Sequence, residues 1–105
     1  MITTHVLDTT SGQPAQGVAV RLESDDRVIG EAVTDNDGRC RSLGPEHVEA
    51  GVYRLVFDTG AYFERAGREA FFPEVTVTFR IADTDRHYHV PVLLSPFSFT
   101  SYRGS

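Results

Sequence analysis

Apolar and polar side chains alternate along most of this chain. The clearest case is Val75–Ile81, where apolar residues alternate with Thr76, Thr78 and Arg80. A period of two, carried by β-branched and aromatic residues, is typical of strands with one buried face. The same pattern predicts eight strands, namely Ile2–Asp8, Val18–Glu23, Val28–Thr34, Arg39–Leu43, Tyr53–Asp58, Val75–Ile81, Tyr88–Leu94 and Phe97–Tyr102.

One segment departs from this period and predicts a short helix. Thr59 can cap its N-terminus, Tyr62, Phe63 and Ala66 share a helical face, and Gly67 can end it. Turn-forming residues separate the predicted strands. Eight short strands with regular turns indicate two packed sheets, a β-sandwich of the all-β class.

The size and charge of the chain narrow its class. Its 105 residues give room for one domain, 1–105. The net charge is −5 and the basic residues are scattered, which argues against nucleic acid or an anionic membrane as a partner. Cys40 is the only cysteine, so no disulfide can form within the chain. The first residues show neither a basic segment nor an apolar one, and we therefore expect a cytoplasmic protein.

The alternation of side chains singles out an unusual polar face. His5 lies on the non-core face of the first predicted strand, His87 and His89 on that of the seventh, and Tyr102 on that of the last. The first and seventh strands also place a leucine on this face. Such a mixture favours a subunit contact lined by a binding site. Surface histidines on a polar strand are the simpler alternative.

Two sequence patterns resemble metal sites but are incomplete. His87 and His89 point the same way, yet a cupin-type site would need a glutamate three or four residues later and a further histidine downstream. The segment Asp35-Asn36-Asp37-Gly38 lacks the glutamate that a calcium loop needs, since Gly44 stands at that position. We therefore predict no metal and no other cofactor, and a hairpin turn at the second pattern.

Two further side chains are candidates for chemistry. Arg39 directly follows the predicted turn, and its forked guanidinium suits a planar, anionic, oxygen-rich ligand. Cys40 lies between two arginines that could lower its pKa, but alternation places it toward the core, which predicts an inert buried thiol. There is no Gly-x-Ser-x-Gly motif and no glycine-rich phosphate loop.

Three motifs and the chain end carry a resemblance to a known family. They are His5-Val6-Leu7-Asp8-Thr9-Thr10-Ser11-Gly12-Gln13-Pro14-Ala15, Thr34-Asp35-Asn36-Asp37-Gly38-Arg39, His87-Tyr88-His89-Val90-Pro91 with Leu94-Ser95-Pro96, and the terminal Tyr102-Arg103-Gly104-Ser105. The chain resembles the transthyretin-related 5-hydroxyisourate hydrolases from end to end. The terminal tetrapeptide separates these hydrolases from the hormone-carrying transthyretins.

The resemblance implies a fold and an assembly. The fold is a transthyretin-like sandwich of two four-stranded sheets, to which the sequence pattern adds one short helix. The assembly is a homotetramer, a dimer of dimers, around a central channel with the sites at subunit interfaces.

The resemblance also implies an activity in urate degradation. This is the hydrolysis of 5-hydroxyisourate to 2-oxo-4-hydroxy-4-carboxy-5-ureidoimidazoline. His5, Arg39 and His89 would be catalytic, and the substrate-binding residues would be Tyr102, Arg103, Gly104 and Ser105. We expect a water between the two histidines to attack the ring carbonyl, with either histidine as the general base.

Two other functions fit a sandwich of this kind. The first is a transthyretin-like carrier that binds a small ligand without catalysis, although the histidines and the terminal tetrapeptide argue against it. The second is a structural or adhesive module, which would need no polar channel.

Overall fold

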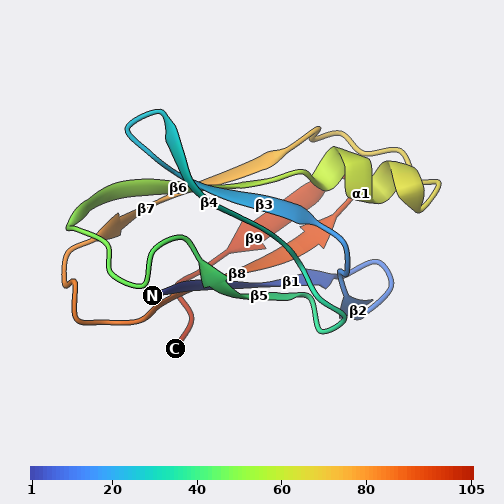
Figure 1. Cartoon of the computed structure of the whole chain (residues 1–105). Coiled ribbons are helices and arrows are strands. Elements are labelled where there is room, and N and C mark those ends of the chain that lie inside the picture. Colours follow the sequence, from blue (N-terminus) through green and yellow to red (C-terminus); the bar gives the residue numbers. More distant parts are fainter.

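The computed structural model describes residues 1–105 and contains two β-sheets with one short helix at one end (Figure 1). All eight predicted strands are present with ends within two residues of the expectation, and Ile2–Asp8, Arg39–Leu43 and Val75–Ile81 match it at both ends. The elements in chain order are β1 (Ile2–Asp8), β2 (Gln13–Pro14), β3 (Ala19–Ser24), β4 (Arg27–Val33), β5 (Arg39–Leu43), β6 (Gly51–Phe57), α1 (Thr59–Arg65), β7 (Val75–Ile81), β8 (Tyr88–Ser95) and β9 (Ser98–Ser101).

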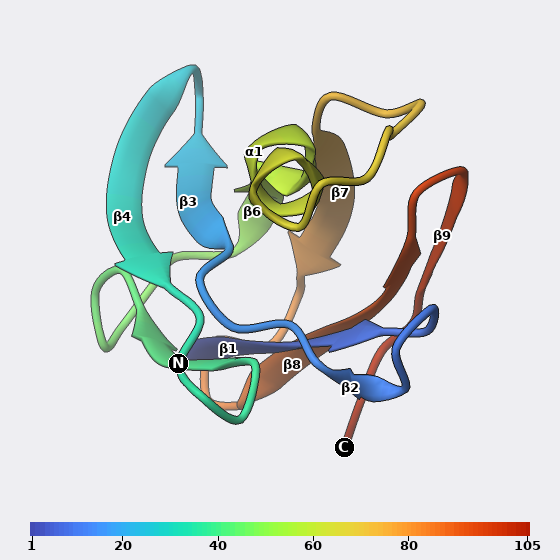
Figure 2. The ribbon, with the colours of Figure 1, turned by 90° about the vertical axis from the view of Figure 1, so that its right-hand side faces the viewer.

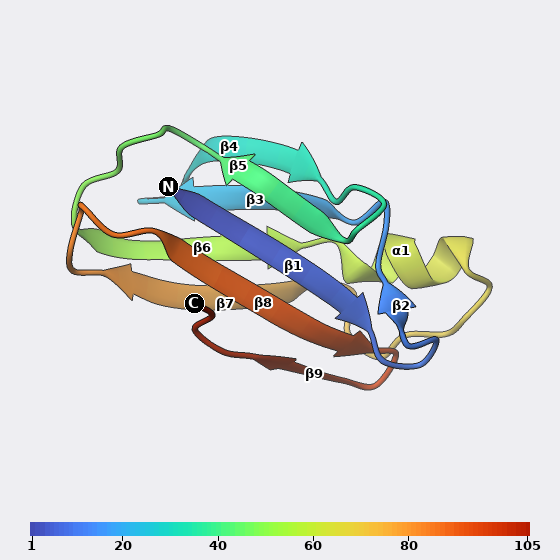
Figure 3. The ribbon, with the colours of Figure 1, turned by 90° about the horizontal axis from the view of Figure 1, so that it is seen from below.

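The first sheet is built around β1. One edge of β1 pairs in parallel with β8, which in turn pairs with β9. The start of β1 pairs with β5 and its end pairs with β2, so these two short strands share the other edge. Five strands therefore make a sheet that is four strands wide. Figure 3 shows this sheet from below, with β5 and β2 along the same side of β1. The additional strand is β2, whose residues Gln13 and Pro14 lie among the turn-forming residues that separate the first two predicted strands.

The second sheet covers one face of the first. Its order is β4-β3-β6-β7, with antiparallel pairing throughout. Figure 2 shows the two sheets as opposite layers, with the C-terminus emerging on the side of the first sheet that faces away from the second. The second sheet and the helix therefore do not cover the outer face of the first sheet.

Alternate side chains of both sheets meet between the layers. Val6 of β1 and Val92 of β8 are fully buried, and Leu22 and Leu55 are buried from the second sheet. Full burial of one such side chain stabilises the fold by about 1.5–3 kcal/mol. Because neighbours in a strand point to opposite faces, this core leaves the polar residues between them on the outer face.

The helix begins one residue earlier than expected. Asp58, not Thr59, is the N-cap, since its carboxylate accepts a hydrogen bond from the Ala61 amide at 3.4 Å. The Thr59 hydroxyl donates instead to the Phe72 carbonyl, and this threonine is buried. Aspartate is the stronger N-cap of the two, so the choice of Asp58 over Thr59 agrees with the usual preference and the prediction of Thr59 is wrong. No helix of this chain has the length and apolar character to cross a bilayer.

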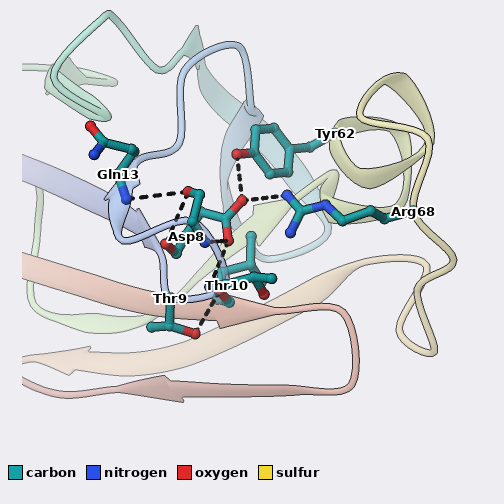
Figure 4. Close-up of polar contacts among 8 residues, drawn as sticks. Asp8, Thr9, Thr10, Gln13, Tyr62 and Arg68 are labelled. Atoms are coloured by element: carbon teal, nitrogen blue, oxygen red, sulfur yellow. Dashed lines mark hydrogen bonds and ion pairs between the residues drawn. The ribbon is translucent and has the colours of Figure 1, made fainter.

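A buried carboxylate ties the end of β1 to the helix region (Figure 4). Asp8 is fully buried, and its Oδ2 accepts hydrogen bonds from the Tyr62 hydroxyl at 2.8 Å and the Arg68 guanidinium at 2.5 Å. Its Oδ1 accepts from the amides of Thr10 and Ser11. Burial raises the pKa of Asp8, but these four hydrogen bonds outweigh it and the pKa is lowered overall. Burial, together with the hydrogen bond to Asp8, raises the pKa of Tyr62 to about 12.

Replacing Asp8 with asparagine is expected to lower the free energy of unfolding by about 2–3 kcal/mol, because it leaves the Arg68 charge unpaired beside the core. Since the folded-state pKa of Asp8 is depressed, this stabilisation is present above its unfolded pKa of about 4 and is lost as the pH falls through the folded value. Urea unfolding from pH 7 to pH 3 should show the difference between the two proteins shrinking in acid.

Asp37→Asn provides the control for this comparison. Asp37 pairs with Arg41 at 3.3 Å, but both side chains are more than half exposed. Exposed pairs of this kind contribute about 0–1 kcal/mol. An Asp8→Asn loss no larger than that of the control would show that the buried network does not stabilise the fold.

Candidate functional site

The register of β5, β1 and β8, which lie side by side in Figure 3, brings the predicted catalytic residues onto one outer face. His5 in β1 lies opposite Arg39 of β5 on one side and Pro91 of β8 on the other. Thr3 lies opposite His89. Residues paired across strands point to the same face, so His5, Arg39 and His89 share it.

An Asx turn positions Arg39 at the start of β5. The Asp35 carboxylate accepts hydrogen bonds from the amides of Asp37 at 2.9 Å and Arg39 at 3.0 Å. Gly38 adopts φ +76°, and a Cβ there would lie 2.4 Å from the Val6 carbonyl oxygen. The predicted turn chemistry is therefore confirmed. The prediction of a hairpin is wrong, because the turn joins β4 of the second sheet to β5 of the first.

Thr3 connects His89 of β8 with His87, which directly precedes this strand. Its hydroxyl lies 2.8 Å from His87 Nε2 and 2.7 Å from His89 Nδ1. Thr3 is 9% exposed, whereas His87 is exposed and His89 is half-buried. Alternation along β1 puts Thr3 on the same face as His5, but no local pattern gives it a role, because its partners lie more than 80 positions away in the chain.

The surroundings of His89 favour its neutral form. Burial lowers its pKa, and the positive charge of Arg39, together with His87 and His5, lowers it further. A hydrogen bond with the Thr3 backbone acts in the opposite direction and does not reverse the shift. A neutral imidazole near pH 7 has a nitrogen lone pair that can accept a proton.

The C-terminal residues lie against the other side of β8. Gly104 forms an isolated bridge with His89, donating its amide hydrogen to the His89 carbonyl at 2.8 Å. A Cβ at Gly104 would lie 2.6 Å from His89 Cδ2 and 3.0 Å from Pro91, so any side chain at this position would have to displace the His89 ring. The bridge continues the register of β8 with β9, which is interrupted opposite Pro91 because proline has no amide hydrogen.

The four terminal residues do not all face the same way. Ser105 lines a hollow together with His89, whereas the Arg103 guanidinium stacks 4.9 Å from the ring centroid of the buried Tyr88. Tyr88 and His89 are neighbours in β8 and point to opposite faces. The side chain of Tyr102 is 56% exposed. The structure thus brings Gly104 and Ser105 to His89 but not the side chain of Arg103.

A shallow polar hollow of about 290 Å³ opens on this face. His5 and Tyr102 are absent from its lining, although His5 lies directly beside Arg39 in the sheet. The hollow could hold a small planar molecule with hydrogen-bonding groups at its edge. It is lined by Met1, Thr3, Thr4, Arg39, Cys40, Arg41, His87, His89 and Ser105.

The structure also shows the surroundings of Cys40 and of the His87 and His89 pair. Cys40 is buried as predicted, and burial raises the pKa of its thiol to about 11, so it is not a thiolate near neutral pH. No group of three or more His, Cys, Asp or Glu side chains gathers in a way that could hold a metal ion. The pair His87 and His89 is instead linked through Thr3.

Comparison with known proteins gives matches over almost the whole chain. The model of the HIUase/Transthyretin family matches residues 2–104. A 5-hydroxyisourate hydrolase from Mus musculus is 45% identical over 111 residues, which cover 99% of this chain and 94% of that protein.

Solved structures with both kinds of function resemble this fold. The structure of Klebsiella pneumoniae 5-hydroxyisourate hydrolase has a TM-score of 0.93 and 39% identity, covering 99% of this chain and 98% of that one. Sea bream transthyretin in complex with thyroxine has a TM-score of 0.90 and 35% identity, covering 98% of this chain and 93% of that one.

Proposed function

This chain belongs to the HIUase/Transthyretin family, and from that premise we propose that it hydrolyses 5-hydroxyisourate. The reaction opens a cyclic amide and gives 2-oxo-4-hydroxy-4-carboxy-5-ureidoimidazoline, a step of urate degradation. The observation that carries this proposal is the placement of His5, Arg39 and His89 on one outer sheet face in a chain with hydrolase relatives. A carrier would need no group able to accept a proton at that position.

We assign the general base to His89. In this mechanism a water between His5 and His89 loses a proton to His89 as its oxygen attacks the ring carbonyl. The lowered pKa of His89 supports the assignment, since the imidazole is neutral near pH 7. Arg39 binds the substrate oxygens and stabilises the oxyanion of the tetrahedral state. The proton then passes to the ring nitrogen as the carbon–nitrogen bond breaks.

We further propose a homotetramer, a dimer of dimers, with sites at the subunit interfaces. Two features support it. Leucines 7 and 93 are only half-buried on the outer face of the first sheet, and Tyr102 is mostly exposed outside the hollow. A second copy against this face would cover the leucines and enclose the substrate. We expect a cytoplasmic location, in which the free thiol of Cys40 stays reduced.

Ultraviolet absorbance tests the activity directly. Urate oxidase generates 5-hydroxyisourate from urate in the cuvette, and the purified chain is then added. We expect its absorbance to decay much faster than in buffer. Decay at the spontaneous rate, with calorimetric binding of a small aromatic ligand, would favour the carrier function instead.

Arg39→Lys is expected to lower kcat/KM for 5-hydroxyisourate by about 10²-fold, the usual effect of losing one oxyanion donor. Lysine keeps the charge but cannot form two parallel hydrogen bonds to a planar substrate. Arg80→Lys is the control, because Arg80 is exposed on β7 of the second sheet. Near-normal kcat/KM for the Arg39 variant would show that charge alone is needed there.

A further inference from the structure

The hydroxyl of Thr3 contacts two imidazole nitrogens but carries only one hydrogen. The nitrogens are His87 Nε2 at 2.8 Å and His89 Nδ1 at 2.7 Å, both within hydrogen-bond distance. The hydroxyl can donate to one of them, and the other nitrogen must then supply its own proton. The tautomers of the two histidines are therefore coupled through Thr3.

The contacts on both sides of the His89 ring fix which nitrogen faces the hollow. Nδ1 lies against Thr3 on the β1 side of β8, and Cδ2 lies against Gly104 on the opposite side. Nε2 is at the tip of the ring, beyond these two atoms, on the face where His89 lines the hollow. Since Thr3 already occupies Nδ1, Nε2 is the ring nitrogen left to interact with a substrate or water in the hollow.

Only one arrangement of protons leaves Nε2 able to accept a proton in neutral His89. Nδ1 must carry the hydrogen and donate it to Thr3 Oγ1. The Thr3 hydroxyl is then free to donate to His87 Nε2, which must be unprotonated. The reverse arrangement, in which Thr3 donates to His89, would place a proton on Nε2 and block it.

We propose that Thr3 and His87 are positioning residues that hold His89 in the Nδ1–H tautomer, with Nε2 free toward the hollow. His87 accepts the Thr3 hydroxyl hydrogen and so sets the direction of that hydroxyl. The role of Nε2 in catalysis rests on the proposed hydrolysis, but the tautomer itself does not. An unrestrained histidine side chain favours the opposite Nε2–H form. The tautomer of His89 therefore distinguishes a ring held by Thr3 from a ring that is not held.

Nitrogen-15 NMR of the histidine side chains tests the tautomer without any substrate. In the wild-type protein at pH 8 we expect His89 to show a protonated Nδ1 and an unprotonated Nε2. An Nε2–H form in the folded wild-type protein would overturn the proposal, whatever the activity. An Nδ1–H form in a protein that does not hydrolyse 5-hydroxyisourate would support the positioning and contradict the proposed function instead.

Variants of Thr3 and His87 test the chain of hydrogen bonds. Thr3→Val keeps the shape of the side chain without the hydroxyl, and we expect kcat to fall about tenfold with KM within twofold and His89 shifting toward Nε2–H. Thr3→Ser should restore both the tautomer and kcat. His87→Leu should act like Thr3→Val, whereas His87→Gln offers an amide oxygen as acceptor and should restore most of kcat.

His47→Leu is the matched control, since His47 is exposed in the loop between β5 and β6. It should leave the tautomer and kcat unchanged. If Thr3→Val folds and retains the Nδ1–H tautomer and wild-type kcat, Thr3 does not position His89. If Thr3→Val does not fold, the variants His87→Leu and His87→Gln and the wild-type NMR spectrum still test whether His89 is held in the Nδ1–H tautomer.

Discussion

Replacing either His5 or His89 with asparagine is expected to lower kcat for 5-hydroxyisourate by about 10²-fold or more. Asparagine keeps a polar side chain but has no nitrogen that accepts a proton near neutral pH. The two histidines lie on the same outer face of neighbouring strands, β1 and β8, with Arg39 beside His5. Steady-state kinetics of absorbance decay measure the loss.

The double variant distinguishes a shared water from two separate functions. If both histidines act on one water, the double variant His5→Asn with His89→Asn should lower kcat by a factor far smaller than the product of the two single factors. Strictly multiplicative losses would mean that they act independently, and the mechanism would fail. His47→Asn, in an exposed loop, should leave kcat unchanged.

Most of the fold follows from local patterns in the sequence. A period of two marked every strand of four or more residues, because most of them bury one face between the sheets; β4 and β9, at sheet edges, contain no fully buried residue. It could not find β2, since two residues are too few to show a period. Pro14 also reads as a turn residue, yet β2 pairs only with β1 and so tolerates a proline at this edge. For the same reason, the first sheet was predicted to contain four strands and has five.

Side-chain alternation predicted the face of the site but not its contacts. It placed His5 and His89 outward because core residues such as Val6 and Val90 adjoin them in their strands, and the structure agrees. The contact of Thr3 with His89 depends on the parallel register of β1 with β8, strands at opposite ends of the chain. No local pattern specifies that register. The placement of Arg103, in contrast, follows from the local pattern. Continuing the alternation past β9 turns the Arg103 side chain to the face of Tyr88, opposite the face on which His89 lies.

The four terminal residues are expected to be essential for turnover although most chain ends can be removed freely. Deleting Tyr102–Ser105 removes the Gly104 backbone that packs against His89 Cδ2 and bonds its carbonyl. With nothing on that side, the His89 ring is free to turn, and a displacement of about 1 Å at a reacting group costs about 10²-fold in rate. We expect kcat to fall by at least that factor.

The fold itself should survive this deletion. The core loses no side chain, and the losses are one backbone hydrogen bond and the stacking of Arg103 on Tyr88, each worth about 1 kcal/mol. Thermal unfolding beside the absorbance assay separates the two effects. A truncated protein that remains active would refute the placement of the tail in the site, and an unfolded one would make its role structural.

Two single substitutions in the complete tail sharpen this test. Gly104→Ala keeps every other tail residue but adds a methyl group that must displace the His89 ring, so we expect kcat to fall about tenfold with little change in stability. Arg103→Ala removes the stacking on Tyr88, so we expect a lower unfolding temperature with kcat and KM within about threefold of wild type. A large rise in KM for Arg103→Ala would instead mean that its guanidinium leaves Tyr88 to bind substrate. Wild-type kcat in Gly104→Ala would show that the close packing of the tail on His89 is not what turnover requires.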